Sequence, residues 1–226
     1  MEDDISMSKL DMVKIEKTMK ALRKNNMQAY FCETAEQAKH QVQQLIKEGD
    51  TITHGGSETL FECGIPDMLK NGAYTYLDRN APGLTKEQIE EIYIKAFSAD
   101  VFLTSTNAIT ENGLLFNVDG NSNRTAAILY GPKSVIVVAG FNKIVKDINE
   151  AFDRLRTTAA PKNTQRLHCN TYCEKTGKCV SLNKTDSLIG DGCGSDQRIC
   201  CNYVISALQR HKDRIKVIIV GEPLGY

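Results

Sequence analysis

The sequence contains no tryptophan, few other aromatic residues and no excess of charge of either sign. It has 8 tyrosines and 7 phenylalanines, and its 28 Lys and Arg residues balance 28 Asp and Glu residues. Binding to nucleic acids or anionic membranes depends largely on excess positive charge, and single-stranded nucleic acids also stack on aromatic side chains. We therefore expect neither a nucleic acid nor a membrane as a partner.

Long apolar runs are also missing. No segment reaches the roughly 18 apolar residues that a membrane-spanning helix needs. The N-terminal sequence MEDDISMSKLD is acidic and lacks the basic start and apolar stretch of a signal peptide. These features predict a cytoplasmic protein. The length of 226 residues and the 41% hydrophobic content fit a single domain over residues 1–226.

Helical and strand patterns alternate along the chain. Helical spacing and one capping box predict helices around residues 12–22, 35–45, 85–96 and 148–155. Compact or alternating apolar runs predict strands at 51–54, 101–105, 114–118, 126–131, 134–140 and 215–221. The part before about residue 48 is expected to be helical. This alternation predicts an α/β fold with a mainly parallel sheet, in which ligands bind beyond the carboxyl ends of the strands.

A glycine turn follows the first predicted strand in the sequence HGGSETL. Gly55 and Gly56 permit a close approach to backbone amides, and Ser57 and Thr59 can bind an anion at a helix start. The alternative is a tight turn with a helix cap, in which His54 is structural. The turn is neither a P-loop nor a Rossmann fingerprint.

A polar run, TSTNAITENGLLFNVDGNSNRTAA, lies between predicted strands and reaches their ends twice. Asn107 follows the first strand, while Asp119, Asn123 and Arg124 follow the next. These four residues are candidates for a polar ligand site, and Glu111 and Asp119 are candidates for proton transfer. The alternative is a pair of turns that use Asn, Asp and Gly, which explains Glu111 well and Arg124 poorly.

Cysteine is almost absent from the first 168 residues, where only Cys32 and Cys63 occur. Six more, at 169, 173, 179, 193, 200 and 201, crowd into a segment of about residues 166–203. The segment is rich in Gly, Asn, Ser and Asp, which predicts a long loop. In a reducing compartment such clustering favours a metal or redox site over disulfides.

The motifs HGGSETL, DRNAPGLT, TSTNAITENGLLFNVDGNSNRTAA, GPKSVIVVAGFNKIV and KVIIVGEPLGY together resemble the lactate-utilisation (LUD) domain family, in its short single-domain members. The resemblance implies a three-layer open sheet of the NagB/RpiA/CoA-transferase-like type. It also implies a role in carboxylate or lactate metabolism, because some relatives belong to a system that oxidises lactate to pyruvate alongside iron–sulfur proteins.

The same resemblance points to four cysteines. Short family members carry a TGKC segment, a further Cys and a DRIC segment, which correspond here to Cys173, Cys179, Cys193 and Cys200. Four thiolates suit zinc or an iron–sulfur cluster. The spacing C-x5-C-x13-C-x6-C includes extra residues before Cys193 and matches neither a zinc finger nor a ferredoxin. Free thiols are the alternative.

Two functions from different classes follow. The first is an enzyme that binds a small anionic metabolite at the strand ends. In CoA transferases of this fold group a Glu-Asn-Gly segment supplies a carboxylate nucleophile, and Glu111-Asn112-Gly113 resembles it locally. The second is a non-catalytic metal-bearing or regulatory subunit that docks on iron–sulfur redox partners. Either could form a homo-oligomer.

Overall fold

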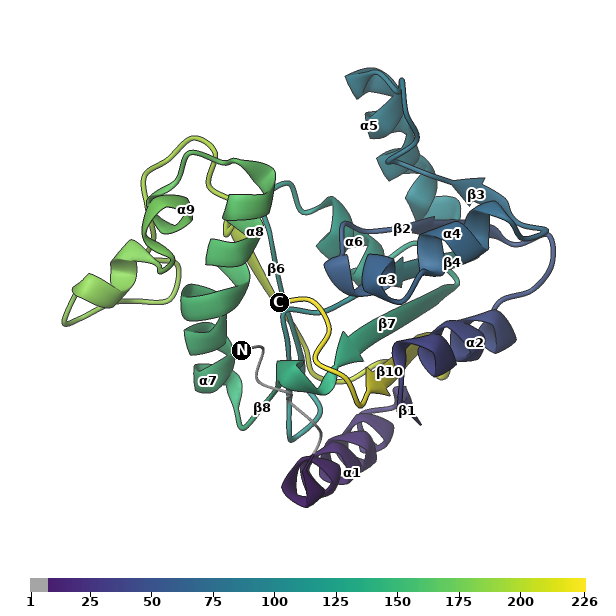
Figure 1. Ribbon diagram of the computed structural model, residues 1–226, viewed down its shortest axis with the longest axis horizontal. Coiled ribbons are helices and arrows are strands. Elements are labelled where there is room, and N and C mark those ends of the chain that lie inside the picture. The colour runs from purple at the N-terminus through teal and green to yellow at the C-terminus, as the bar shows by residue number, and fades with distance from the viewer. Residues whose placement is uncertain (1–7) are drawn as a thin grey trace, which may run out of the picture.

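The computed structural model describes residues 8–226 and has a six-stranded parallel sheet at its centre (Figure 1). The strands lie in the order β1-β10-β7-β4-β2-β3. Their bounds are β1 Gln28–Cys32, β2 Thr51–His54, β3 Thr75–Leu77, β4 Val101–Thr104, β7 Ser134–Gly140 and β10 Ile215–Val220. All neighbouring pairs in this sheet are parallel, so every carboxyl end lies on the same edge.

Helices cover both faces of this sheet because its central strands are apolar on both sides. Val217 and Ile219 of β10 pack into one core, and Ile218 and Val220 into the other. Helices α1 (Lys9–Lys24) and α6 (Asn123–Leu129) contribute to the first core. Helices α2 (Ala35–Leu45), α3 (Glu58–Glu62) and α4 (Ile65–Lys70) contribute to the second.

A second, smaller sheet has the order β8-β5-β6-β9 and lies beside the first. Its strands are β5 Ala108–Thr110, β6 Leu115–Asp119, β8 Ile144–Val145 and β9 Asn202–Ser206. A third core joins it to α7 (Ile148–Arg154), to the π-helical turn Leu155–Ala159 and to α8 (Ala160–Leu167). The cysteine-rich segment follows, with the short helix α9 (Tyr172–Thr176), at the left in Figure 1.

The predicted fold class and most predicted elements are confirmed. Helix α5 (Lys86–Lys95) begins with the expected capping box between Thr85 and Gln88. None of the helices within residues 8–226 is long and apolar enough to cross a membrane. The acidic N-terminal residues 1–7 lie outside the described part of the chain.

Two expectations are wrong. The run AAILYG is not a strand but belongs to α6, whose first turn is held by the Asp119 carboxylate accepting from the Thr125 amide at 2.7 Å. The apolar run therefore forms the buried side of a short helix. The part before residue 48 is not purely helical, because β1 lies between α1 and α2. β1 pairs with β10, a strand from the far end of the chain.

Candidate functional site

A cleft of about 450 Å³ opens at the carboxyl ends of the parallel strands. The loops after β2, β3, β4 and β7 form its walls. After β2 the chain goes on to β3 at one edge of the sheet. After the neighbouring β4 it passes through β5 and β6 of the second sheet and returns at β7 on the other side, so the two connections diverge. Parallel sheets bind ligands at such switch points. The predicted site residues that line the cleft are Gly56, Ser57, Asn107, Asp119, Asn123 and Arg124.

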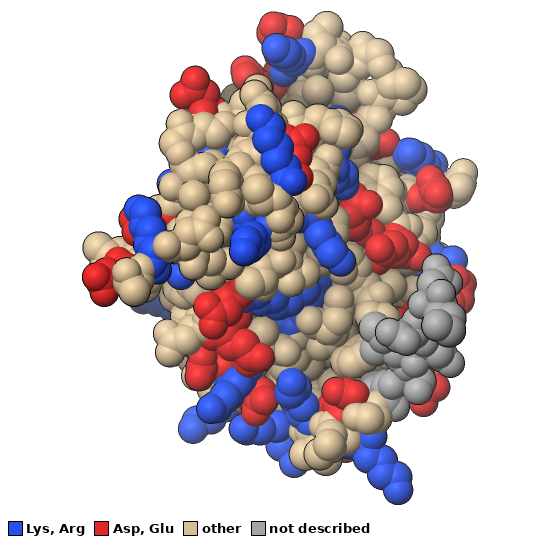
Figure 2. All heavy atoms as spheres, turned by 60° about the vertical axis from the view of Figure 1, so that its left-hand side comes forward, with Lys and Arg blue, Asp and Glu red and all other residues tan. Residues whose placement is uncertain are grey.

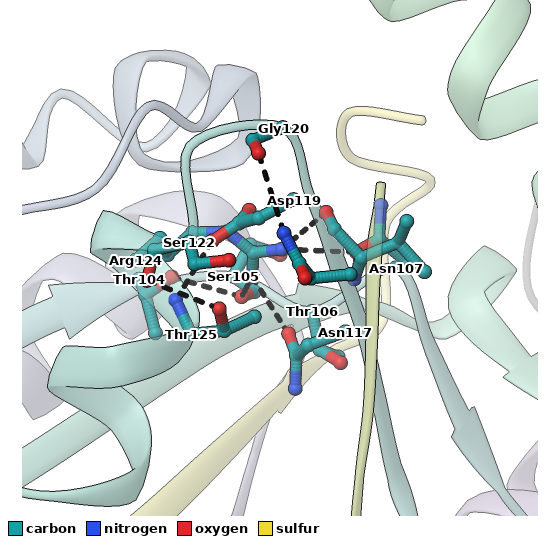
Figure 3. A network of polar contacts seen from close by, with 12 residues as sticks. Thr104, Ser105, Thr106, Asn107, Asn117, Asp119, Gly120, Ser122, Arg124 and Thr125 are labelled. Carbon is teal, nitrogen blue, oxygen red and sulfur yellow. Dashed lines mark hydrogen bonds and ion pairs between the residues drawn. The ribbon is translucent and has the colours of Figure 1, made fainter. Parts of the chain in front are cut away.

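Arg124 organises one wall of this cleft (Figure 3). Its Nε donates to Asp119 Oδ1 at 3.0 Å. Its Nη1 donates to the Ser105 carbonyl and to Asn117 Oδ1, and its Nη2 donates to Asn107 Oδ1 and the Val118 carbonyl. An arginine has five N–H hydrogens, and here each has an acceptor. Arg124 therefore contributes charge to the cleft while its hydrogen bonds hold the ends of β4 and β6 together.

The partners of Arg124 are fixed in turn. Asp119 accepts from Arg124 through one oxygen and from the Thr125 amide through the other. The Asn107 side-chain oxygen accepts from Arg124 and from the Val118 amide at 2.8 Å, which fixes the orientation of its amide group. The Asn107 NH₂ group has no protein partner within residues 8–226, and the residue lines the cleft. It is a preoriented donor for a ligand.

The two glycines of the HGGSETL turn have different roles. The Gly55 amide donates to the Leu103 carbonyl, and a Cβ at this position would lie 2.9 Å from the Arg124 side chain. Gly55 therefore makes room for Arg124. A Cβ on Gly56 would instead project into the cleft, 4.0 Å from Arg79 Nη1 and 4.0 Å from Arg166 Nη2. Ser57 caps α3 by accepting from the Leu60 amide.

The space beside Gly56 is a cradle between two guanidinium groups. Arg79 lies over the Tyr93 ring, 4.9 Å from its centroid, and its buried Nε has no partner in the described part of the chain. Arg166 comes from α8 on the opposite wall, where its Nε donates to the Tyr226 hydroxyl at 2.6 Å. Its Nη1 forms a 3.3 Å ion pair with Glu58. The cradle can take an anion that two arginines hold together.

Basic side chains outnumber acidic ones around the cleft. The lining cations are Arg79, Arg124, Lys143, Arg166 and Arg198, and the lining anions are Glu58, Asp119 and Asp196. Figure 2 shows basic side chains grouped around the middle of the face that carries α7 and α8, with acidic ones beside them. The balanced net charge of the chain therefore hides a local excess of positive charge at this site.

Lys143, just after β7, is the most buried cation of the cleft, with 3% of its surface exposed. Its Nζ donates to Thr59 Oγ1 at 2.9 Å and to Ser105 Oγ at 3.0 Å. Burial lowers the pKa of Lys143 to about 7, Arg154 and Arg124 act in the same direction, and Glu62 opposes them. Thr59, predicted to bind ligand, instead holds this lysine from behind the cleft wall.

His54 has the structural role expected of the alternative interpretation. It is buried, and its Nδ1 donates to the Gly55 carbonyl at 2.7 Å. Its ring packs between Phe61 and Tyr76. Burial lowers the pKa of His54, which keeps the imidazole neutral near pH 7.

Glu111 does not reach the cleft. It lies in the tight turn between β5 and β6, whereas Asn107 and Asp119 lie at the opposite ends of these strands. Its carboxylate pairs with Lys17 of α1 at 2.7 Å, and Gly113 packs against the backbone of the same helix. The expected position of Glu111 in the ligand site is therefore not observed. Its sequence matches a catalytic segment locally, but the turn serves to dock α1.

The cysteine-rich segment brings four of its thiols to one place. Cys173, Cys179, Cys193 and Cys200 line a second cavity of about 20 Å³, together with residues such as Leu155 and Tyr203. Cys169 and Cys201 are not among its lining residues. Within residues 8–226 no three or more Cys, His, Asp or Glu side chains are arranged to hold a metal ion. The thiols are thus gathered without forming a complete set of ligands.

Arg198 lies between the cysteine cavity and the cleft. Its Nε donates to Cys200 Sγ at 3.2 Å and to the Cys200 carbonyl at 3.0 Å. Burial raises the pKa of the Cys200 thiol, while the Arg198 charge opposes this shift. Asp196, Gln197, Arg198 and Ile199 also line the cleft. One short segment therefore contributes to both cavities.

Comparison with known proteins gives the family. The model of the LUD domain matches residues 15–220. The chain belongs to the LUD domain family. A DUF162 family protein from Deinococcus radiodurans shares its fold, with 12% identity and a TM-score of 0.50 over 93% of this chain and 98% of that one. A search of curated proteins found no significant match.

Two other solved structures show weaker likeness to this LUD domain. Ribose 5-phosphate isomerase from Plasmodium falciparum is 15% identical, with a TM-score of 0.34 over 78% of each chain. eIF2B beta from Chaetomium thermophilum is 16% identical, with a TM-score of 0.35 over 51% of this chain and 44% of that one. Both likenesses are too distant to bear on function. The family and the three-layer α/β fold expected from the sequence are confirmed by the family match and the fold itself.

Several cleft residues of this LUD domain escaped the sequence analysis. Arg79 and Lys143 each follow a strand, in the quoted segments DRNAPGLT and GPKSVIVVAGFNKIV, and polar residues after strands were the available signal. Arg166 had no such signal, because it comes from α8, whose place beside the cleft depends on how the second sheet packs.

Proposed function

We propose that this protein of lactate-utilisation type binds a small carboxylate or phosphate metabolite in the strand-end cleft, as an enzyme or enzyme subunit. The observation that carries the proposal is the cradle at Gly56, where nitrogen atoms of Arg79 and Arg166 face one open position. The Arg79 side chain forms no hydrogen bond or ion pair within residues 8–226, so an anion beside Nη1 would pair a charge that folding leaves unpaired. Asn107 supplies a further fixed donor on the wall that Arg124 organises.

Calorimetric titration with inorganic phosphate, L-lactate and pyruvate tests this proposal. We expect at least one of them to bind, and we expect Arg79→Gln to weaken that binding about tenfold to a hundredfold, the effect of one charge-assisted hydrogen bond. Arg210→Gln is the matched control, because Arg210 is exposed and does not line the cleft. Absence of binding by all three anions, or equal losses in both variants, would overturn the proposal.

We also propose that the four cysteines bind one soft divalent cation, either zinc or iron(II). The convergence of the four thiols on one cavity supports this, since thiolates prefer such ions. A cavity of about 20 Å³ has room for roughly one water-sized occupant. This size favours a single ion over the larger iron–sulfur cluster. The bound ion would tie α9 and the turn after it to the loop before β9, as a structural staple.

Metal analysis of protein purified without oxygen tests the cysteine site. We expect one zinc or iron per chain in the native protein and less than a tenth of this in Cys179→Ser. Cys201→Ser is the matched control: this thiol is exposed and donates to the Arg198 carbonyl, so metal content should not change. A broad visible absorption band together with several irons per chain would show that the site holds an iron–sulfur cluster instead of a single ion. A metal-free native protein would refute the site.

The second hypothesis, a regulatory subunit that docks on iron–sulfur partners, makes a different prediction for the same variants. A docking subunit needs the cysteine segment but not the arginine cradle. Arg79→Gln would then leave partner capture unchanged while Cys179→Ser abolishes it. This second hypothesis assigns no role to the arginine cradle. For that reason metabolite binding is the better-supported function.

A further inference from the structure

Lys143 is a buried amine whose surroundings differ from those of an ion-pairing lysine. No carboxylate in residues 8–226 lies within ion-pair distance of its Nζ, and its two partners, Thr59 and Ser105, are hydroxyls. A buried ammonium without a carboxylate is costly, and the lowered pKa of Lys143, about 7, reflects that cost. A substantial fraction of this amine is therefore neutral at neutral pH.

The hydrogen bonds around Nζ are those that a neutral amine can make. Thr59 Oγ1 donates its own hydrogen to the Leu224 carbonyl at 3.4 Å and so accepts from Lys143. Ser105 Oγ accepts the second N–H. A neutral amine has two N–H hydrogens and one lone pair. Both hydrogens are thus used, and the lone pair has no partner among the described residues.

The amine belongs to a residue of the cleft wall. Lys143 lines the strand-end cleft together with Ser105, Gly56 and the two arginines of the cradle. Gly225 packs close to the amine, since a Cβ there would lie 3.1 Å from Nζ and 2.5 Å from Thr59 Oγ1. Thr59, which holds Nζ, is three residues after Gly56, so one short segment supports the amine and the anion cradle.

We propose that Lys143 forms a Schiff base with the keto group of a 2-oxo carboxylate whose carboxylate lies in the Arg79–Arg166 cradle. This inference rests on the proposed metabolite site and names its substrate class. The Nζ lone pair attacks the carbonyl carbon, and the carbonyl oxygen takes up a proton to give a carbinolamine. As the C–O bond breaks, the second N–H proton passes to the oxygen, which leaves as water, and a C=N bond joins the substrate to Nζ. Ser105, 3.0 Å from Nζ, relays the proton that the nitrogen loses.

Reductive trapping tests the proposal. The full-length protein is incubated with pyruvate and cyanoborohydride, which reduces the C=N bond to a stable amine, and the modified residue is mapped by peptide mass spectrometry. We expect one 1-carboxyethyl group per chain, on Lys143. Lys143→Arg should lose it, and Lys133→Arg, at an exposed lysine paired with Asp100, should retain it. Ser105→Ala keeps the lysine and should slow trapping about tenfold or more.

The pH profile provides a second readout. Trapping should rise through about pH 7 as Lys143 loses its proton; burial, Arg154 and Arg124 favour that loss, and Glu62 and Cys63 oppose it. Modification spread over surface lysines would refute the inference, as would pyruvate binding by calorimetry without an adduct on Lys143. In that second case the proposed metabolite site would stand. Absence of any anion binding would instead refute both.

Discussion

Replacing Arg124 by alanine is expected to lower the free energy of unfolding by about 3–5 kcal/mol, the usual cost of removing one partner of a buried ion pair. The Arg124 and Asp119 side chains are only 11% and 12% exposed, so solvent screens their interaction little. The variant also leaves the carbonyls of Ser105 and Val118 without their arginine donor. Urea denaturation of the variant and the native protein measures the difference.

Two further variants make the Arg124 prediction specific. Arg210→Ala removes an exposed arginine and should change stability by less than about 0.5 kcal/mol. Arg124→Lys keeps the charge but cannot supply five donors in a plane, so its stability should fall between those of the native protein and the alanine variant. A loss below about 1 kcal/mol in Arg124→Ala would contradict the structural role assigned to this residue.

The role of Arg124 also shows how far the sequence could predict the site. Its position before a buried segment indicated a functional arginine, and it does lie on the cleft wall. The sequence could not show that all five donors are used by the protein, because the acceptors come from β6 and from the loop after β4. In the proposed site the direct anion contacts come instead from Arg79 and Arg166, which only the packed structure brings to one point.

Local patterns predicted the central strands well because those strands are apolar on both faces. The run SVIVVAG forms β7 and IKVIIV forms β10, both in the middle of the sheet. The same criterion failed for AAILYG, since a short apolar run fits a buried helix turn equally well. Strand β1 escaped because it lies at the sheet edge, where its pairing with β10 depends on a segment more than 180 residues later.

Glu111 illustrates the opposite error, in which a local motif suggested more than the fold allows. Glu-Asn-Gly is both a plausible catalytic segment and a favourable turn sequence, and sequence alone does not separate the two. The decisive information is that Gly113 has a φ of 81° and contacts the backbone of α1. If the turn is docked on α1, adding a side chain at Gly113 should lower the stability of the protein.

Gly113→Ala is therefore expected to destabilise the protein by at least about 3 kcal/mol. A positive φ costs an alanine about 1 kcal/mol or more of conformational free energy. Its Cβ would also lie 2.7 Å from the backbone of Ala21 and Leu22, and backbone atoms within a helix have little room to move. The turn must then shift away from α1, which breaks the hydrogen bonds from Asn25 Nδ2 to the Asn112 and Gly113 carbonyls. Thermal and urea unfolding measure the loss.

Gly83→Ala provides the matched control. Gly83 has nearly the same φ, 82°, but a Cβ there has no atom within 4 Å. It should show the backbone strain alone, about 1 kcal/mol, so the difference between the two variants isolates the contact with α1. Glu111→Gln should cost less than about 1 kcal/mol, because Lys17 is 65% exposed, and should leave anion binding unchanged. Equal losses of stability in the two glycine variants would show that the turn is not docked on α1. Loss of anion binding in Glu111→Gln would show that Glu111 belongs to the ligand site.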